Sequence, residues 1–141
     1  MDHGMPIIRH TTRLLNAEVR EKLPLKLHVK NDITIRSVER TEGRSSDESV
    51  TFHMSYEFKA TYNETVAEIT IQGETVYVTS SETAEEIEKS WEERKALPEK
   101  VMLEVGNFCL MKAQMQAVML ANELDIQSPV RLPQIEPRKK G

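Results

Sequence analysis

Hydrophobic and polar residues alternate along much of the first eighty positions. The cleanest stretch is 50–58, where every second residue is apolar, and similar alternation runs through 6–22, 25–40 and 66–78. Side chains of a β-strand point alternately to its two faces, so each stretch predicts a strand with one buried face. Four strands joined by short connections favour an antiparallel meander.

Two positions interrupt this alternation. Val38 falls out of phase with the apolar residues before it, which predicts a bulge near Ser37. Gly73 precedes Val76 and Val78, which have the opposite phase to Ala67, Ile69 and Ile71. A glycine inside a strand often marks a bulge, so we expect the inward face to switch at Gly73.

The spacing changes to a helical one after residue 79. Ser80 and Ser81 can cap a helix whose narrow apolar stripe holds Ala84, Ile87 and Trp91, and Leu97-Pro98 ends it. A second helix is predicted over 101–124, which is too apolar to be covered on one side only. The pattern therefore predicts an α+β fold: a four-stranded antiparallel sheet followed by two helices, with the long C-terminal helix packed on the sheet.

With 141 residues, the chain has the usual size of a single domain. We expect this domain to span 7–135. A flexible tail is predicted for 1–6 and a disordered basic tail for 136–141. The segment 125–137 after the long helix is expected to be extended, because Ser128-Pro129 and Leu132-Pro133 exclude helix there.

Charge and cysteine content narrow the class of protein. The net charge of −4 gives no basic surface for nucleic acid. One cysteine and no signal-peptide pattern favour a cytoplasmic protein. Glu104 and Lys112 interrupt the long apolar helix, so insertion into a membrane is not expected.

Catalytic chemistry has few candidates in this sequence. The four histidines have no metal-ligand spacing, the five glycines form no phosphate-binding loop, and Cys109 lies in the apolar helix, where burial makes a thiol inert. We therefore predict no catalytic residue, no metal and no cofactor.

The methionine-rich helix has two interpretations. Methionine fills irregular gaps in cores, and it is also frequent on surfaces that adapt to many apolar partners. We expect a core or a subunit interface here, and hence a homo-oligomer, a dimer or a tetramer. The residues assigned to this core or oligomer helix are Phe108, Met111, Met115 and Met119.

Three segments of the second half resemble the SecB-like chaperone family. They are the last strand with its glycine (67–78), the long helix (107–121) and the proline-bearing apolar phrase that follows it (126–135). The resemblance covers most of 7–135. It implies a SecB-like fold of four antiparallel strands, a helical region, a long helix and an extended tail. It also implies a protein that assembles through its sheets and helices and holds unfolded chains in apolar grooves, without catalysis.

The leading hypothesis is thus a holdase chaperone that binds non-native polypeptide through apolar surface, with a link to protein export left open. Val76, Tyr77 and Trp91 are the candidate client-binding residues, although a tryptophan in such a stripe more often packs its helix onto the sheet. The alternative is an adaptor for one specific protein partner. A third is a small enzyme with a site at a subunit interface, near His28 or His53.

Overall fold

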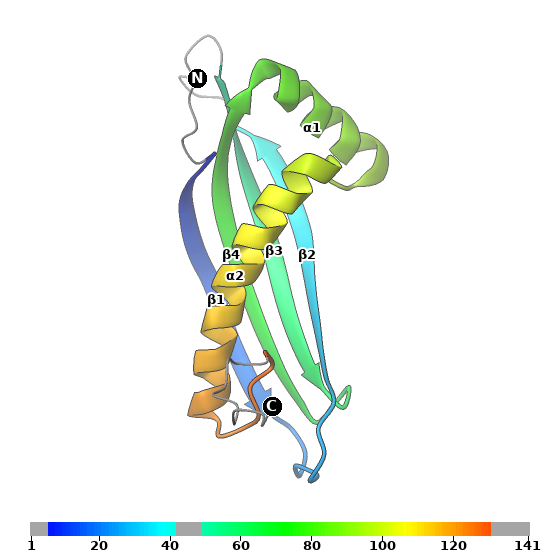
Figure 1. Cartoon of the computed structure of the whole chain (residues 1–141), viewed down its shortest axis with the longest axis vertical. Coiled ribbons are helices and arrows are strands. Elements are labelled where there is room, and N and C mark those ends of the chain that lie inside the picture. Colours follow the sequence, from blue (N-terminus) through cyan, green and yellow to red (C-terminus); the bar gives the residue numbers. More distant parts are fainter. Residues whose placement is uncertain (1–5, 42–48, 131–141) are drawn as a thin grey trace, which may run out of the picture.

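The computed structural model describes residues 6–41 and 49–130. Four strands precede two helices (Figure 1), which confirms the predicted α+β fold class. The elements are β1 (Ile7–Val19), β2 (Val29–Arg40), β3 (Ser49–Tyr62), β4 (Ala67–Ser80), α1 (Ser81–Arg94) and α2 (Glu99–Glu123). The tails predicted for 1–6 and 136–141 lie almost entirely outside the described residues, and the domain limits stay a prediction.

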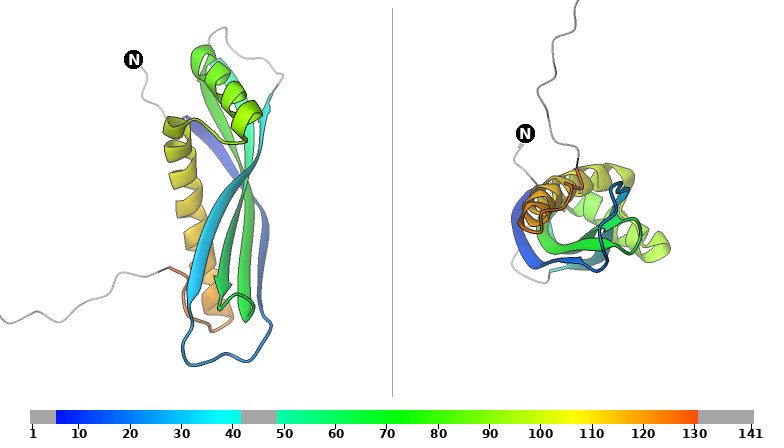
Figure 2. Two further views of the ribbon diagram at one scale, coloured as in Figure 1. Left: turned by 90° about the vertical axis from the view of Figure 1, so that its right-hand side faces the viewer. Right: turned by 90° about the horizontal axis from the view of Figure 1, so that it is seen from below.

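The strands form one antiparallel sheet in the order β1-β4-β3-β2. The predicted four-stranded meander is therefore correct only for β2, β3 and β4. β1 lies instead on the free side of β4, with Ile7 opposite Tyr77 and Val19 opposite Ala67. The connection between β1 and β2 crosses the end of the sheet to make this possible (Figure 2). Both β1 and β2 are therefore edge strands.

The core lies between one face of the sheet and the long helix. Every second residue of β3 is buried, as predicted from its alternation. The helix α2 crosses this face, and α1 covers its upper end (Figure 1). At the lower end the chain after α2 is tied to the sheet, because the Tyr62 hydroxyl donates to the Gln127 carbonyl at 2.7 Å and the Asn31 amide donates to the Pro129 carbonyl at 2.9 Å. One extended layer of apolar side chains thus holds the helices on the sheet.

Both edge strands carry a bulge at the middle of their length. The register of β2 shifts between Ile35 and Ser37, which confirms the predicted bulge, and that of β1 shifts between Thr12 and Leu14. The expected switch of face at Gly73 is wrong. The β3–β4 register runs through Gly73 without a shift, so Tyr77 points to the helices and Val76 to the opposite face.

Ser80 caps α1, as predicted, by accepting a hydrogen bond from the Thr83 amide. The helix ends at Lys95 in the left-handed conformation, which is earlier than the predicted stop at Leu97-Pro98. Asn63 and Glu64 both have positive φ and make the tight turn between β3 and β4.

Candidate functional site

Two rows of residues on opposite sides of α2 differ sharply in size and exposure. The row against the sheet is buried and mostly small, and the outer row is mostly large, apolar and exposed. Both rows have a spacing of four residues and are offset from each other by two. The inner row is Val101, Val105, Cys109, Ala113, Ala117 and Ala121, and the outer row, here called the α2 ridge, is Leu103, Asn107, Met111, Met115 and Met119.

The rows wind round the helix because four residues turn an α-helix by about 400°. The inner row can stay in contact over its whole length because the sheet beneath it is itself twisted. Small side chains in this row let the helix backbone approach the sheet closely. The ridge winds in parallel on the outer side, where within the described residues no other part of the chain covers it.

Hydrogen bonds between polar groups complete the contact of α2 with the sheet. The Gln116 amide donates to the Thr12 hydroxyl at 2.7 Å, and the Tyr77 hydroxyl donates to the Glu104 carboxylate at 2.8 Å. The Gln116 side-chain carbonyl is the one buried side-chain polar atom without a hydrogen-bond partner in the described part of the chain. These bonds fix α2 along β1 and β4 by specific polar contacts as well as by packing.

His10 lies in this contact between the sheet and α2. Its Nε2 is 2.7 Å from the Tyr56 hydroxyl oxygen. The centroid of its ring lies 5.8 Å from that of the Phe108 ring, and the two rings are arranged edge to face. Burial, and after it the nearby Lys112 ammonium, lowers the pKa of His10 below its usual 6.5. The folded protein therefore favours the neutral imidazole.

This preference predicts a pH dependence of stability. Above about pH 6.5 the histidine is neutral in both the folded and the unfolded chain, and its contribution is complete. As the pH falls from there through the lower pKa of the folded state, the unfolded chain binds more protons and stability decreases. A His10→Gln variant should lose this part of the pH dependence in urea unfolding between pH 5 and 8. An unchanged profile would contradict the assignment.

The two sheet edges differ in how much apolar surface they expose. Along β1 and the connection after it, six large apolar side chains are exposed, and Leu25 is fully so at 108%. They are Ile8, Leu14, Leu15, Val19, Leu23 and Leu25. The exposed positions of β2 are instead polar or charged, and its apolar residues are half-buried. Charged edges resist pairing with other strands, whereas apolar ones promote it. The β1 edge is therefore the edge of the sheet that is more open to pairing with another strand.

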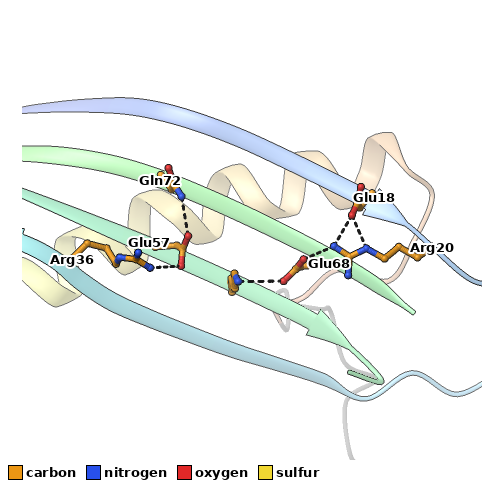
Figure 3. Close-up of polar contacts among 7 residues, drawn as sticks. Glu18, Arg20, Arg36, Glu57, Glu68 and Gln72 are labelled. Carbon is orange, nitrogen blue, oxygen red and sulfur yellow. Dashed lines mark hydrogen bonds and ion pairs between the residues drawn. The ribbon is translucent and has the colours of Figure 1, made fainter. Parts of the chain in front are cut away.

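Ion pairs cover the sheet face that points away from α2. Arg20 donates hydrogen bonds to the carboxylates of Glu18 and Glu68 (Figure 3). The Lys59 ammonium lies 3.6 Å from the same Glu68 carboxylate. These contacts connect the ends of β1, β4 and β3. The hydrogen bond from Arg20, more than any other cause, holds the pKa of Glu68 below its usual range. The charged groups in this part of the face are thus paired with one another.

A second polar group lies further along the same face. Arg36, at the β2 bulge, contacts Glu57 at 3.1 Å, and the Gln72 amide donates to the other Glu57 oxygen at 2.8 Å (Figure 3). Beside them a shallow hollow of about 310 Å³ opens between the two bulges, with Arg13 on one side and Arg36 on the other. Its lining is mostly polar or charged.

The structure separates the three predicted client-binding residues. Tyr77 is buried under α2, and Val76 lies on the opposite face, next to Arg9 and His53 in the register. Trp91 is half-buried on α1, with the Lys95 ammonium 5.7 Å from its ring centroid. Tyr77 and Val76 cannot line one groove, because the sheet lies between their side chains. Client binding at Trp91 stays a prediction.

The residues predicted for the core or for an oligomer interface divide in the same way. Phe108 is half-buried and packs against the core. Met111, Met115 and Met119 are exposed at 53%, 63% and 66% and belong to the ridge. Their role in a subunit interface stays a prediction.

The residues considered for catalysis or metal binding do not lie together at one site. His28 lies before β2 and His53 on the polar face of β3, 3.8 Å from Glu74. Cys109 is fully buried, and burial raises the pKa of its thiol to about 12. Among the described residues no group of three or more His, Cys, Asp or Glu side chains is placed to hold a metal ion. None of the described helices is both long and apolar enough to cross a membrane.

Sequence reasoning missed the β1 edge as a surface. The signal was present, because Leu14 and Leu15 are adjacent and must point to opposite faces of any strand. One of them is then always on the face that a half-buried strand keeps polar. Such a pair indicates an edge that is apolar on both faces.

Comparisons with known proteins give one structural likeness. No family model matches the chain, and no curated protein matches its sequence. Among solved structures, the chain is similar to a SecB-like chaperone of Mycobacterium tuberculosis, solved in complex with a ChAD peptide from the HigA1 antitoxin. The likeness has a TM-score of 0.49 and 13% sequence identity, and it covers 94% of this chain and 91% of that one.

Proposed function

We propose that this protein is a chaperone-type binding protein that holds non-native polypeptide by apolar contact. The observation that carries the proposal is the β1 edge, a long edge strand with exposed apolar side chains on both faces. Single exposed apolar residues are ordinary, but a row of them along an edge strand indicates an interaction surface.

The bulge at Arg13 limits where a bound chain can pair. After it the register of β1 with β4 is regular from Leu14 to Val19. The free backbone groups of this segment can hydrogen-bond to any extended polypeptide, since main-chain pairing does not depend on sequence. Leu14, Leu15 and Val19 then contact apolar side chains of the bound strand, which favours unfolded over folded partners.

The α2 ridge is assigned to assembly. It is a row of residues at i, i+4 spacing, and two such ridges pack into each other at a crossing angle of about −50°. Two copies related by a two-fold axis at Met115 place Met111 of one ridge beside Met119 of the other, one turn from the crossing point. Such a self-complementary pairing is the usual form of a homodimer contact. It leaves the β1 edge of each copy free for polypeptide.

The test is whether the protein delays the aggregation of an unrelated, chemically unfolded substrate. Wild type should do so near stoichiometric amounts. A variant with Leu14→Lys and Leu15→Lys should need about ten times more protein or more, because two charges would have to be desolvated against the bound chain. Light scattering measures both.

A matched control places a lysine on the other edge. Thr34 is exposed on β2, and Thr34→Lys should delay aggregation as wild type does. If the double lysine variant is folded and fully active, binding does not use the β1 edge. Capture of a single partner at fixed stoichiometry would favour the adaptor alternative instead.

A further inference from the structure

We propose that Met111, Met115 and Met119 are a reversible oxidation site that controls assembly through the α2 ridge. The proposal rests on the assembly role given to the ridge above. It adds a modification of the same surface and predicts that oxidation of the three thioethers separates the copies.

Accessibility selects these three methionines. They are more than half exposed, whereas Met54 is fully buried in the core and Met102 is half-buried. The spacing of four residues places the three side chains one after another along the ridge, because residues four apart are neighbours on a helix surface. An oxidant that enters from solvent therefore meets three adjacent sulfur atoms, and it reaches Met54 only if the core opens.

The reaction needs only a peroxide. The thioether sulfur attacks one peroxide oxygen, the O–O bond breaks, and the products are a sulfoxide and water. The sulfur is oxidised by two electrons and hydrogen peroxide is reduced by two. A thiol-dependent sulfoxide reductase reverses the step: two thiols become a disulfide, and the sulfoxide oxygen leaves as water.

A sulfoxide acts differently in the separated and in the assembled protein. On the separated chain its oxygen stays hydrated on an exposed surface, so the fold loses little. Between two packed ridges the same oxygen is removed from water without a partner, which opposes association. Three sulfoxides in one contact should weaken assembly about ten-fold or more.

The experiment follows mass and modification together. Protein is treated with hydrogen peroxide, its mass in solution is measured by light scattering, and each methionine is followed by mass spectrometry of peptides. We expect Met111, Met115 and Met119 to react before Met54, and the oligomer to dissociate as they react. Their reaction should also slow as protein concentration rises, because assembly covers them.

A leucine variant separates oxidation from packing. Met111→Leu, Met115→Leu and Met119→Leu together keep an apolar ridge of similar volume and remove the sulfur atoms. This variant should assemble as wild type does and keep its mass in peroxide. Sulfoxide reductase with a thiol reductant should restore the mass of the oxidised wild-type protein.

The outcomes distinguish the two proposals. An untreated protein that is monomeric at all concentrations refutes ridge assembly and the oxidation site with it. An oligomer that persists when all three methionines are sulfoxides overturns the oxidation site alone. Loss of mass in the leucine variant under the same treatment also overturns it. Delay of substrate aggregation by the β1 edge is measured separately and stands or falls by its own variants.

Discussion

Replacing Gly73 by alanine is expected to lower the free energy of unfolding by about 2 to 3 kcal/mol. An added Cβ would lie 2.7 Å from both the ring Cε1 and the hydroxyl oxygen of Tyr56. The ring cannot withdraw, because it is buried in the core and its hydroxyl is bonded to His10. Either the ring or strand β4 must shift, and the contact of α2 with the sheet is disturbed with it. Urea unfolding measures the loss.

Gly106→Ala is the matched control for this steric effect. There the nearest atoms to the added Cβ all belong to the flexible Met102 side chain, whose terminal methyl lies at 2.9 Å and can move aside. Alanine also favours the interior of a helix over glycine by about 1 kcal/mol. This variant should be as stable as wild type or more so. Equal losses in the two variants would show that Tyr56 does not decide the requirement for glycine at position 73.

Replacing Ala113 by leucine is expected to cost about 2 kcal/mol. Ala113 is fully buried at the middle of the inner row of α2. Three added carbon atoms have no room between the helix backbone and the sheet, so α2 must move outward. The Gln116 to Thr12 hydrogen bond, one turn further on, is then lengthened or lost. The expected result is a lower urea midpoint with an altered near-UV spectrum.

Met115→Leu is the control on the outer side of the same helix. Met115 is exposed, and leucine has similar volume and helix propensity. We expect its unfolding midpoint to match wild type. A large loss here with none in Ala113→Leu would mean that the inner and outer rows are assigned the wrong way round.

The predicted elements agree with the structure where a strand or helix has one buried face and one face exposed to solvent. The alternation in 50–58 gave β3, the bulge near Ser37 is present, and Ser80 caps α1. These features depend on local spacing and local hydrogen bonds. A single sequence contains that information directly, so both helices and all four strands were predicted.

The parity error at Gly73 has a different origin. β4 is central in the sheet and nearly buried on both faces, so its apolar residues do not alternate as those of a half-buried strand do. Val76 is apolar on the ion-paired face and Thr75 is polar under the helix. The pattern therefore suggested a bulge where the glycine instead accommodates the Tyr56 ring, a contact between two strands that no local spacing encodes.

The candidate surfaces were predicted in part. The long helix was expected to have more apolar surface than one sheet face can cover, and the exposed ridge agrees with that. Its division into a small inner row and a large outer row was not predicted, although each row has a spacing of four residues in the sequence. Which edge strand pairs with β4 was not predicted either, because it depends on the path of residues 20–28 across the end of the sheet.

The strand order also has a consequence for how the chain folds. β1 is synthesised before the other strands, yet its only strand partner in the described sheet is β4. Ile7 therefore cannot pair until Tyr77 has been synthesised. Pairings between distant segments slow folding, because the intervening chain must be ordered before they form. During synthesis the β2–β3–β4 hairpins can form while β1 is still unpaired. The newly made protein therefore passes through a stage in which its own first strand is itself a non-native polypeptide that needs a partner.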